Sequence, residues 1–90
     1  MTEKEQLYYL LRAFHSKKID ANTFTNHFVR IFDLEIDYEE LSKKEYDILG
    51  NISDMAARFS DSLEDLELPN VYFSEKQIRE EVNQALKSLT

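Results

Sequence analysis

Several residue types are scarce or missing in this chain. Cysteine is absent, and glycine and proline occur once each in 90 residues. Without cysteine, the chain has no disulfide framework, thiol nucleophile or cysteine metal site. So little glycine and proline argues strongly against an all-β fold, which needs many turns, and it excludes the glycine-rich loops that cradle phosphates. The sequence therefore predicts a helical fold.

Long apolar runs are missing as well. No stretch is long enough for a transmembrane helix, and the polar N-terminus, Met-Thr-Glu-Lys-Glu-Gln, does not match a signal peptide. Hydrophobic residues nevertheless make up 42% of the chain, which favours an ordered domain over disorder. We therefore expect a single domain over residues 1–90, in a cytoplasmic protein that makes no contact with membranes.

Apolar residues recur at helical spacing in four segments, and each segment is predicted to be an amphipathic helix. The stripes are Leu7, Leu10, Leu11 and Phe14; Ala21, Phe24, Phe28, Ile31 and Phe32; Ile48, Leu49, Ile52, Met55, Ala56 and Phe59; and Ile78, Val82, Ala85, Leu86 and Leu89. From these stripes, the residues expected to be buried include Phe24, Phe28, Leu49, Ile52, Phe59, Val82 and Leu86.

Local signals mark where three of these helices begin. Asp20 suits an N-cap, and the pairs Ser42 with Glu45 and Ser74 with Gln77 each have the spacing of a capping box. Gly50 lies inside the third helix, where it indicates close approach of a neighbour. The segment 61–72 contains Pro69 and Asn70 and cannot be one continuous helix. Short connections make neighbouring helices antiparallel, so the predicted fold is an all-α, antiparallel four-helix bundle.

Charge is concentrated in the middle of the sequence. Residues 33–67 hold twelve Asp and Glu against three Lys and Arg, so this segment has a net charge of −9. The remaining residues have a net charge of +2, which gives −7 for the whole chain. Most single carboxylates are expected to be solvated surface groups. The surplus as a whole predicts a basic protein partner, and it argues against binding to nucleic acid or to anionic membranes.

Patterns for catalysis or for metals are weak. His15 and His27 lack a carboxylate or a second histidine at zinc-site spacing, and we expect structural or surface roles for both. No EF-hand loop or nucleophile elbow occurs, and no carboxylate pair lies in an apolar context. The triplet Asp61-Ser62-Leu63 resembles the modified serine site of acyl carrier proteins, but the long helix expected after that serine would run into Pro69. We therefore expect neither an enzyme nor a bound cofactor or metal.

Three further motifs resemble those of the colicin D immunity protein family. Phe14, Lys18-Ile19-Asp20-Ala21 and Phe24 are similar to the family's helix–turn–helix opening. The stretch Met55-Ala56-Ala57-Arg58-Phe59 resembles its Ala-Ala-x-Arg-Phe motif, compressed by one residue. Tyr72, Ile78, Val82 and Leu86 match its closing spacing, so the resemblance covers about residues 7–89.

The resemblance implies a four-helix bundle that binds the nuclease domain of a colicin or of a contact-dependent growth inhibition toxin. In the colicin D case that toxin cleaves transfer RNA, and acidic residues of the inhibitor stand in for RNA phosphates. The family's type member has a glutamate just before the Arg-Phe pair. Here that position is Ala57, so this contact is not carried over.

Two functions from different classes remain open at the level of sequence. The first is an immunity protein that covers a basic cleft of a toxin nuclease, such as a transfer-RNA nuclease. The alternative is a small acidic adaptor or regulatory bundle that binds another basic protein. For the first, the expected toxin-binding residues lie at the end of the third helix and in the loop after it: Asp54, Asp61, Glu64, Asp65, Glu67, Tyr72 and Phe73.

Overall fold

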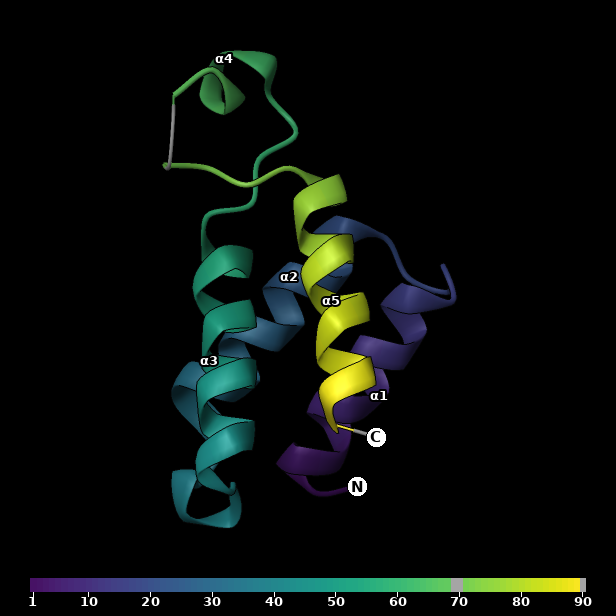
Figure 1. Ribbon diagram of the computed structural model, residues 1–90, viewed down its shortest axis with the longest axis vertical. Helices are drawn as coiled ribbons and strands as arrows, with labels where there is room; N and C mark the ends of the chain where they lie inside the picture. Colours follow the sequence, from purple (N-terminus) through teal and green to yellow (C-terminus); the bar gives the residue numbers. More distant parts are fainter. Residues whose placement is uncertain (69–70, 90) are drawn as a thin grey trace.

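The chain folds into four main helices joined by three connections of very different shape (Figure 1). This computed structural model describes residues 1–68 and 71–89. The main helices are α1 (Glu3–His15), α2 (Ala21–Arg30), α3 (Lys43–Ala57) and α5 (Glu75–Leu89). Shorter elements are the π-helical turn η1 (Ile31–Glu35), the 3-10 turn η2 (Tyr38–Glu40) and the one-turn helix α4 (Leu63–Leu66).

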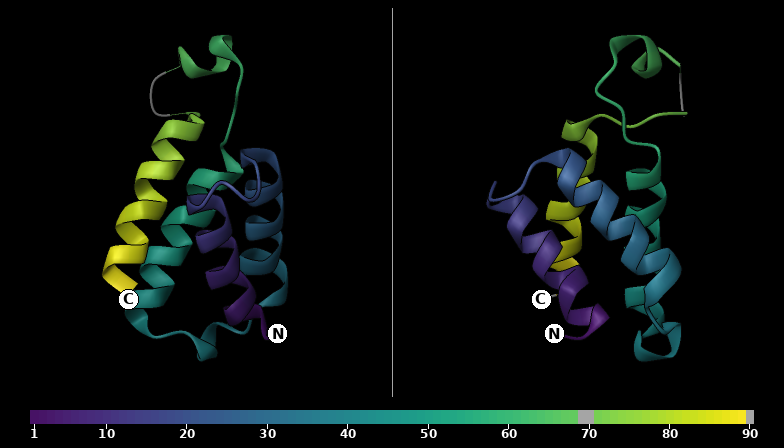
Figure 2. Two further views of the ribbon diagram at one scale, coloured as in Figure 1. Left: turned by 90° about the vertical axis from the view of Figure 1, so that its right-hand side faces the viewer. Right: turned by 180° about the vertical axis from the view of Figure 1, so that it is seen from behind.

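The main helices run alternately up and down and pack in a closed ring. α1 packs against α2 and α5, and α3 packs against the same two helices from the other side. Both termini therefore lie at one end of the bundle, as the side and rear views show (Figure 2). The predicted antiparallel four-helix bundle is confirmed, and no β-strand occurs among residues 1–68 and 71–89.

Side-chain caps explain where the main helices begin. The Asp20 carboxylate accepts a hydrogen bond from the Thr23 backbone N–H at 2.8 Å, as predicted. Both predicted capping boxes form: Ser42 pairs reciprocally with Glu45, and Ser74 with Gln77. A third box, Thr2 with Glu5, opens α1. Each cap satisfies backbone N–H groups that the first helical turn leaves without a partner.

Phenylalanine rings dominate the centre of the core. The rings of Phe14 and Phe24 stack with centroids 4.5 Å apart, and Phe28 lies 5.3 Å beyond Phe24. All three rings are fully buried. The Arg79 guanidinium covers the outer face of Phe14 at 4.0 Å and donates a 2.6 Å hydrogen bond to the Phe14 carbonyl oxygen. α5 is thereby attached to the C-terminal end of α1.

Two residues predicted to be buried are only partly so. Phe59 and Leu86 lie at the edge of the core, half-buried against it. For Phe59 the reason is that α3 ends at Ala57, two residues earlier than the apolar stripe extends, so its ring leaves the helical face. The other five predicted core residues are buried: Phe24, Phe28, Leu49, Ile52 and Val82.

Gly50 marks a close approach, as its place in the third helix predicts. A Cβ atom built on Gly50 would lie 3.3 Å from Cζ of Phe32, which belongs to η1. The glycine thus lets a buried aromatic ring from the preceding segment lie directly on the surface of α3.

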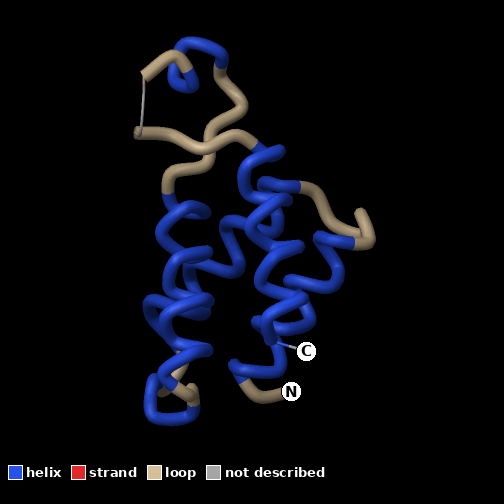
Figure 3. Tube along the Cα trace, viewed as in Figure 1, coloured by secondary structure: helices blue, strands red, loops and turns tan. Residues whose placement is uncertain are grey.

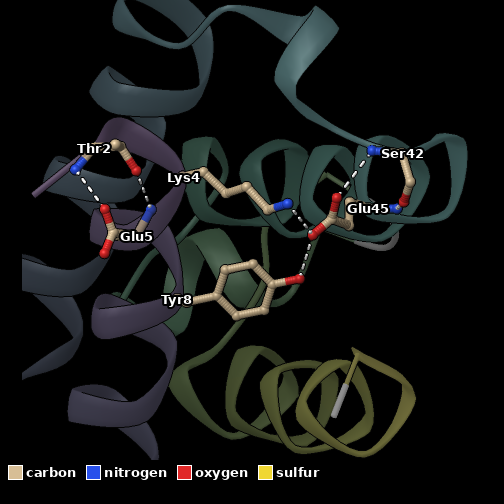
Figure 4. Close-up of polar contacts among 6 residues, drawn as sticks. All are labelled: Thr2, Lys4, Glu5, Tyr8, Ser42 and Glu45. Carbon is tan, nitrogen blue, oxygen red and sulfur yellow. Dashed lines mark hydrogen bonds and ion pairs between the residues drawn. The ribbon is translucent and has the colours of Figure 1, made fainter.

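A polar contact ties α1 to the start of α3 (Figure 4). The hydroxyl of Tyr8 donates a hydrogen bond of 2.6 Å to Oε2 of Glu45, and Nζ of Lys4 lies 3.1 Å from the same oxygen. The other oxygen, Oε1, accepts the backbone N–H of Ser42 at 2.9 Å. One carboxylate therefore caps α3 and holds α1 against it.

Candidate functional site

The end of α3 and the start of α5 are joined by a loop over residues 60–72, and its described residues, 60–68 and 71–72, lie beyond the end of the bundle (Figure 3). Its base is closed by an isolated parallel bridge between Phe59 and Phe73. The Phe73 backbone N–H donates to the Arg58 carbonyl oxygen at 2.9 Å, and the Ser60 N–H donates to the Phe73 carbonyl oxygen at 3.0 Å. Both ends of the loop are thereby fixed to the core.

Hydrogen bonds also organise the first half of the loop. The Ser60 hydroxyl donates to Oδ2 of Asp65 at 2.8 Å and accepts the backbone N–H of Ser62 at 3.1 Å. Between these partners the chain turns into α4, a helix of only four residues. Asp65 is half-buried, and its contact with Ser60 gives it a part in shaping the loop.

The predicted acidic residues fall into two groups. Asp61, Glu64 and Glu67 are exposed on the loop, and none of them makes an ion pair within residues 1–68 and 71–89. Asp54 lies one helical turn before the end of α3 and pairs with Arg58, with 3.4 Å between Oδ1 and Nη2. Of the predicted acidic residues, the three exposed loop carboxylates are therefore the ones available to pair with basic side chains of a partner.

The two aromatic residues predicted to bind the toxin, Tyr72 and Phe73, are not fully exposed to solvent. Tyr72 and Phe73 are both half-buried, and Phe73 packs against the core and forms the bridge at the base of the loop. The apolar side chains that do face solvent were not singled out from sequence: Leu63 is 80% exposed, Leu68 51% and Val71 45%. The feature of the sequence that could have indicated these three residues is the presence of apolar side chains within a strongly acidic loop. Pro69 and Asn70, which divide the predicted loop, lie outside the described residues.

The acidic middle of the sequence is divided between the two ends of the bundle. α3 separates the loop 60–72 from the connection between α2 and α3, which holds η1 and η2 (Figure 1). Residues 33–47 carry seven acids and two bases, or −5, and residues 54–67 carry five acids and one base, or −4. The surplus that is continuous in sequence therefore forms two separate charged regions.

The remaining candidate groups occupy surface positions. Nδ1 of His15 lies 2.6 Å from Oδ1 of Asn83, and Nδ1 of His27 lies 3.2 Å from Nη2 of Arg30. Both histidines are exposed. Ser62 precedes only the one-turn α4, so it lacks the long helix that follows a carrier-protein serine. Within the described part of the chain, no group of histidine and acidic side chains has the arrangement of a metal site.

Comparison with protein families gives one result. Residues 1–89 match the model of a family described as bacterial self-protective colicin-like immunity. No curated protein and no solved structure matches the chain. None of the helices over residues 1–68 and 71–89 has the length and apolar character to cross a membrane.

The family match extends over nearly the whole bundle, including every element that positions the loop 60–72. It agrees with the resemblance that the sequence motifs indicate, and it favours toxin neutralisation over a general adaptor function. The chain belongs to the bacterial self-protective colicin-like immunity family, whose members neutralise a toxin by binding it and are not enzymes.

Proposed function

We propose that this protein neutralises a toxin nuclease by covering its basic active-site cleft with the acidic loop 60–72. The observation that carries the proposal is the combination of three free carboxylates, Asp61, Glu64 and Glu67, on a loop whose two ends are fixed to the core. A nuclease that holds RNA or DNA presents lysine and arginine to phosphates. Carboxylates that occupy the same positions compete with the nucleic acid.

The geometry of the loop favours this function because contacts within the chain hold both of its ends and its first turn. The bridge between Phe59 and Phe73 holds the two ends of the loop, and the contact between Ser60 and Asp65 holds its first turn, without any contact from a partner. A pre-formed loop loses less conformational entropy on binding than a flexible one. The exposed Leu63 adds apolar surface beside the charges, so the loop can bury both kinds of contact.

The proposal also includes the substrate of the toxin and the system that delivers the toxin. A transfer-RNA nuclease fits the resemblance to colicin D immunity, and delivery by contact-dependent growth inhibition fits it equally. An inhibitor that protects the cell producing the toxin acts where the toxin's substrate lies, which for transfer RNA is the cytoplasm. Asp54, Asp65, Tyr72 and Phe73 remain proposed toxin-binding residues beside the three free carboxylates.

The test uses the C-terminal domain of the cognate toxin, which we expect to be encoded immediately upstream of this chain. Co-expression with the wild-type chain should restore growth. A triple variant, Asp61→Asn, Glu64→Gln and Glu67→Gln, should bind at least about tenfold more weakly, roughly 1.4 kcal/mol. The matched control is Glu3→Gln, Glu80→Gln and Glu81→Gln, which removes the same charge from side chains of α1 and α5 that make no ion pair within the described residues, 1–68 and 71–89. Equal weakening by both sets would mean that net charge alone matters and would exclude the loop as the site.

A further inference from the structure

Two tyrosine rings lie exposed at the opposite end of the bundle from the loop 60–72. Tyr38 of η2 is 43% exposed and Tyr46 of α3 is 45% exposed. Their centroids are 5.3 Å apart in an edge-to-face arrangement, and both rings rest on the buried Phe32, at 5.2 Å and 6.0 Å. The pair is held in place by packing against the core, although each ring keeps a large area in contact with solvent.

Five carboxylates lie in the same connection as Tyr38, and one of them is already paired, since Nε of Arg30 lies 3.3 Å from Oε2 of Glu35. Residues 33–42 hold five acidic residues and no lysine or arginine, and all five are exposed: Asp33, Glu35, Asp37, Glu39 and Glu40. Burial, the charge of Asp33 and the neighbouring Tyr46 raise the pKa of Tyr38, which agrees with a position beside a carboxylate. We call the two rings and these five carboxylates the tyrosine surface.

The chemistry of the tyrosine surface selects one kind of side chain. A guanidinium group is flat and weakly hydrated, so it stacks on an aromatic face while its N–H groups pair with carboxylates. A lysine ammonium makes the charge contact, but it lacks the flat stacking face. Because the rings are already packed on Phe32, little side-chain entropy is lost when they are covered.

A groove along α2 and α3 lies between the base of the loop 60–72 and the connection that carries Tyr38, although none of the residues of the tyrosine surface lines it. It has a volume of about 450 Å³, and its lining includes Val29 and Leu34 on one side and Ala57 and Phe59 on the other. Tyr46 and Ala57 are eleven residues apart on the same stripe of α3, which corresponds to about 16 Å along the helix. A standard interface buries roughly 800 Å² per partner, so a single protein domain can span this distance.

We propose that the tyrosine surface binds arginine side chains of the same toxin that contacts the loop 60–72, with the α2–α3 groove lying between the two contacts. This inference rests on the toxin-neutralising function of the family, and it adds a second contact at the other end of the bundle. The partner is a protein segment that presents arginine. Tyr38 and Tyr46 provide stacking, and the exposed carboxylates of residues 33–40 provide charge.

The first test replaces both rings with a side chain of similar apolar character. The double variant Tyr38→Leu and Tyr46→Leu keeps a cover over Phe32 but removes the aromatic faces. We expect it to bind the upstream toxin domain at least about tenfold more weakly, with thermal unfolding close to that of the wild type. Tyr9→Leu is the matched control, since Tyr9 is 50% exposed on α1 and lies outside the tyrosine surface. Wild-type affinity of the double variant would overturn the inference.

The second test uses the wild-type protein alone, so it depends neither on whether a variant folds nor on the toxin. An oligo-arginine peptide and an oligo-lysine peptide of equal length are titrated into the wild-type protein, and the ring resonances of the tyrosines are followed by NMR. We expect those of Tyr38 and Tyr46 to shift, at lower concentrations of the arginine peptide than of the lysine peptide. An equal response to both peptides, or shifts confined to the loop 60–72, would overturn the inference.

The outcomes separate this inference from the proposed function. Loss of affinity in the loop triple variant alone supports the loop and contradicts the tyrosine surface. Loss in the tyrosine double variant alone supports the tyrosine surface and contradicts the loop as the main site. If the wild-type chain fails to bind the toxin domain, the proposed function fails, while the peptide titration still decides whether the tyrosine surface recognises arginine.

Discussion

The Tyr8 hydroxyl donates a 2.6 Å hydrogen bond to the Glu45 carboxylate, across thirty-seven residues of sequence. Burial, the hydrogen bond to Glu45 and the charge of Glu45 all raise the pKa of Tyr8, so the hydroxyl remains a donor well above neutral pH. Burial by itself would raise the pKa of Glu45, but hydrogen bonds from Tyr8, Ser42 and Lys4 outweigh it and lower that pKa to about 2. The contact joins α1 to the N-terminal cap of α3.

Removing this hydroxyl should weaken the bundle measurably. A hydrogen bond to a charged group contributes about 1.5–3 kcal/mol. Because Lys4 and Ser42 still contact Glu45 in its absence, we expect Tyr8→Phe to lower the free energy of unfolding by about 1–2 kcal/mol. Chemical denaturation measures the change. Tyr9→Phe is the control on the same helix, and an equal loss in both variants would show that the contact with Glu45 contributes nothing specific.

Stability should fall in acid because of Glu45. Its pKa in the folded protein, about 2, lies below the ordinary value of 4.5. The stabilisation is therefore fully present above pH 4.5 and is lost as the pH falls from there towards 2. We expect the free energy of unfolding of the wild type to drop more over this range than that of Glu45→Gln, by roughly 2–3 kcal/mol.

Denaturation curves collected between pH 2 and pH 7 would check the role of Glu45. Above pH 5 the Glu45→Gln variant should be the less stable protein, and the two curves should converge in acid. Parallel profiles for the two proteins would assign the acid sensitivity to other carboxylates.

Two phenylalanine truncations should differ in severity. Phe24 is fully buried and stacks on Phe14, so Phe24→Ala should cost about 3–5 kcal/mol. Phe59 is half-buried at the edge of the core, and its truncation should cost less, on the order of 1–3 kcal/mol. Thermal and chemical unfolding rank the two. A greater loss at position 59 would mean that the bridge to Phe73 matters more to the fold than ring burial.

Lys17 offers a stabilising substitution. It has a φ of 64° in the turn after α1, where its N–H donates to Phe14 O and the Lys18 N–H donates to Ala13 O. This pattern is a Schellman motif, whose left-handed position normally holds glycine, and a side chain there is strained by about 1–2 kcal/mol. After allowing for the greater freedom of glycine in the unfolded chain, Lys17→Gly should stabilise by about 0.5–1 kcal/mol. Lys18→Gly, without a positive φ, should not stabilise the protein.

Association with the toxin should depend on salt through the loop 60–72. Asp61, Glu64 and Glu67 are exposed, and charges of this kind act mainly on the association rate. Raising the ionic strength from about 0.01 M to 0.15 M shortens the screening length from about 30 Å to 8 Å. The wild-type association rate should fall over this range, and that of the loop triple variant should fall less. If the two proteins share one salt dependence, the loop does not steer binding.

The sequence by itself determined the four main helices and the starts of three of them. The apolar stripes and the caps at Asp20, Ser42 and Ser74 depend on residues three or four apart, which interact within one helical turn. Gly50 indicates a close approach because glycine inside a helix lowers its stability unless the space is needed, but the sequence does not identify Phe32 as the neighbour. The motifs spread over the helices also sufficed to identify the family.

Tertiary structure decided how distant groups combine. The pairing of Tyr8 with Glu45, the bridge of Phe59 to Phe73 and the packing of two tyrosines on Phe32 all join residues that no helical period relates. Only the folded chain divides the acidic segment, because α3 carries its two halves to opposite ends of the bundle. Charge along a sequence adds up regardless of position, whereas a partner meets only the charges that folding places on one surface.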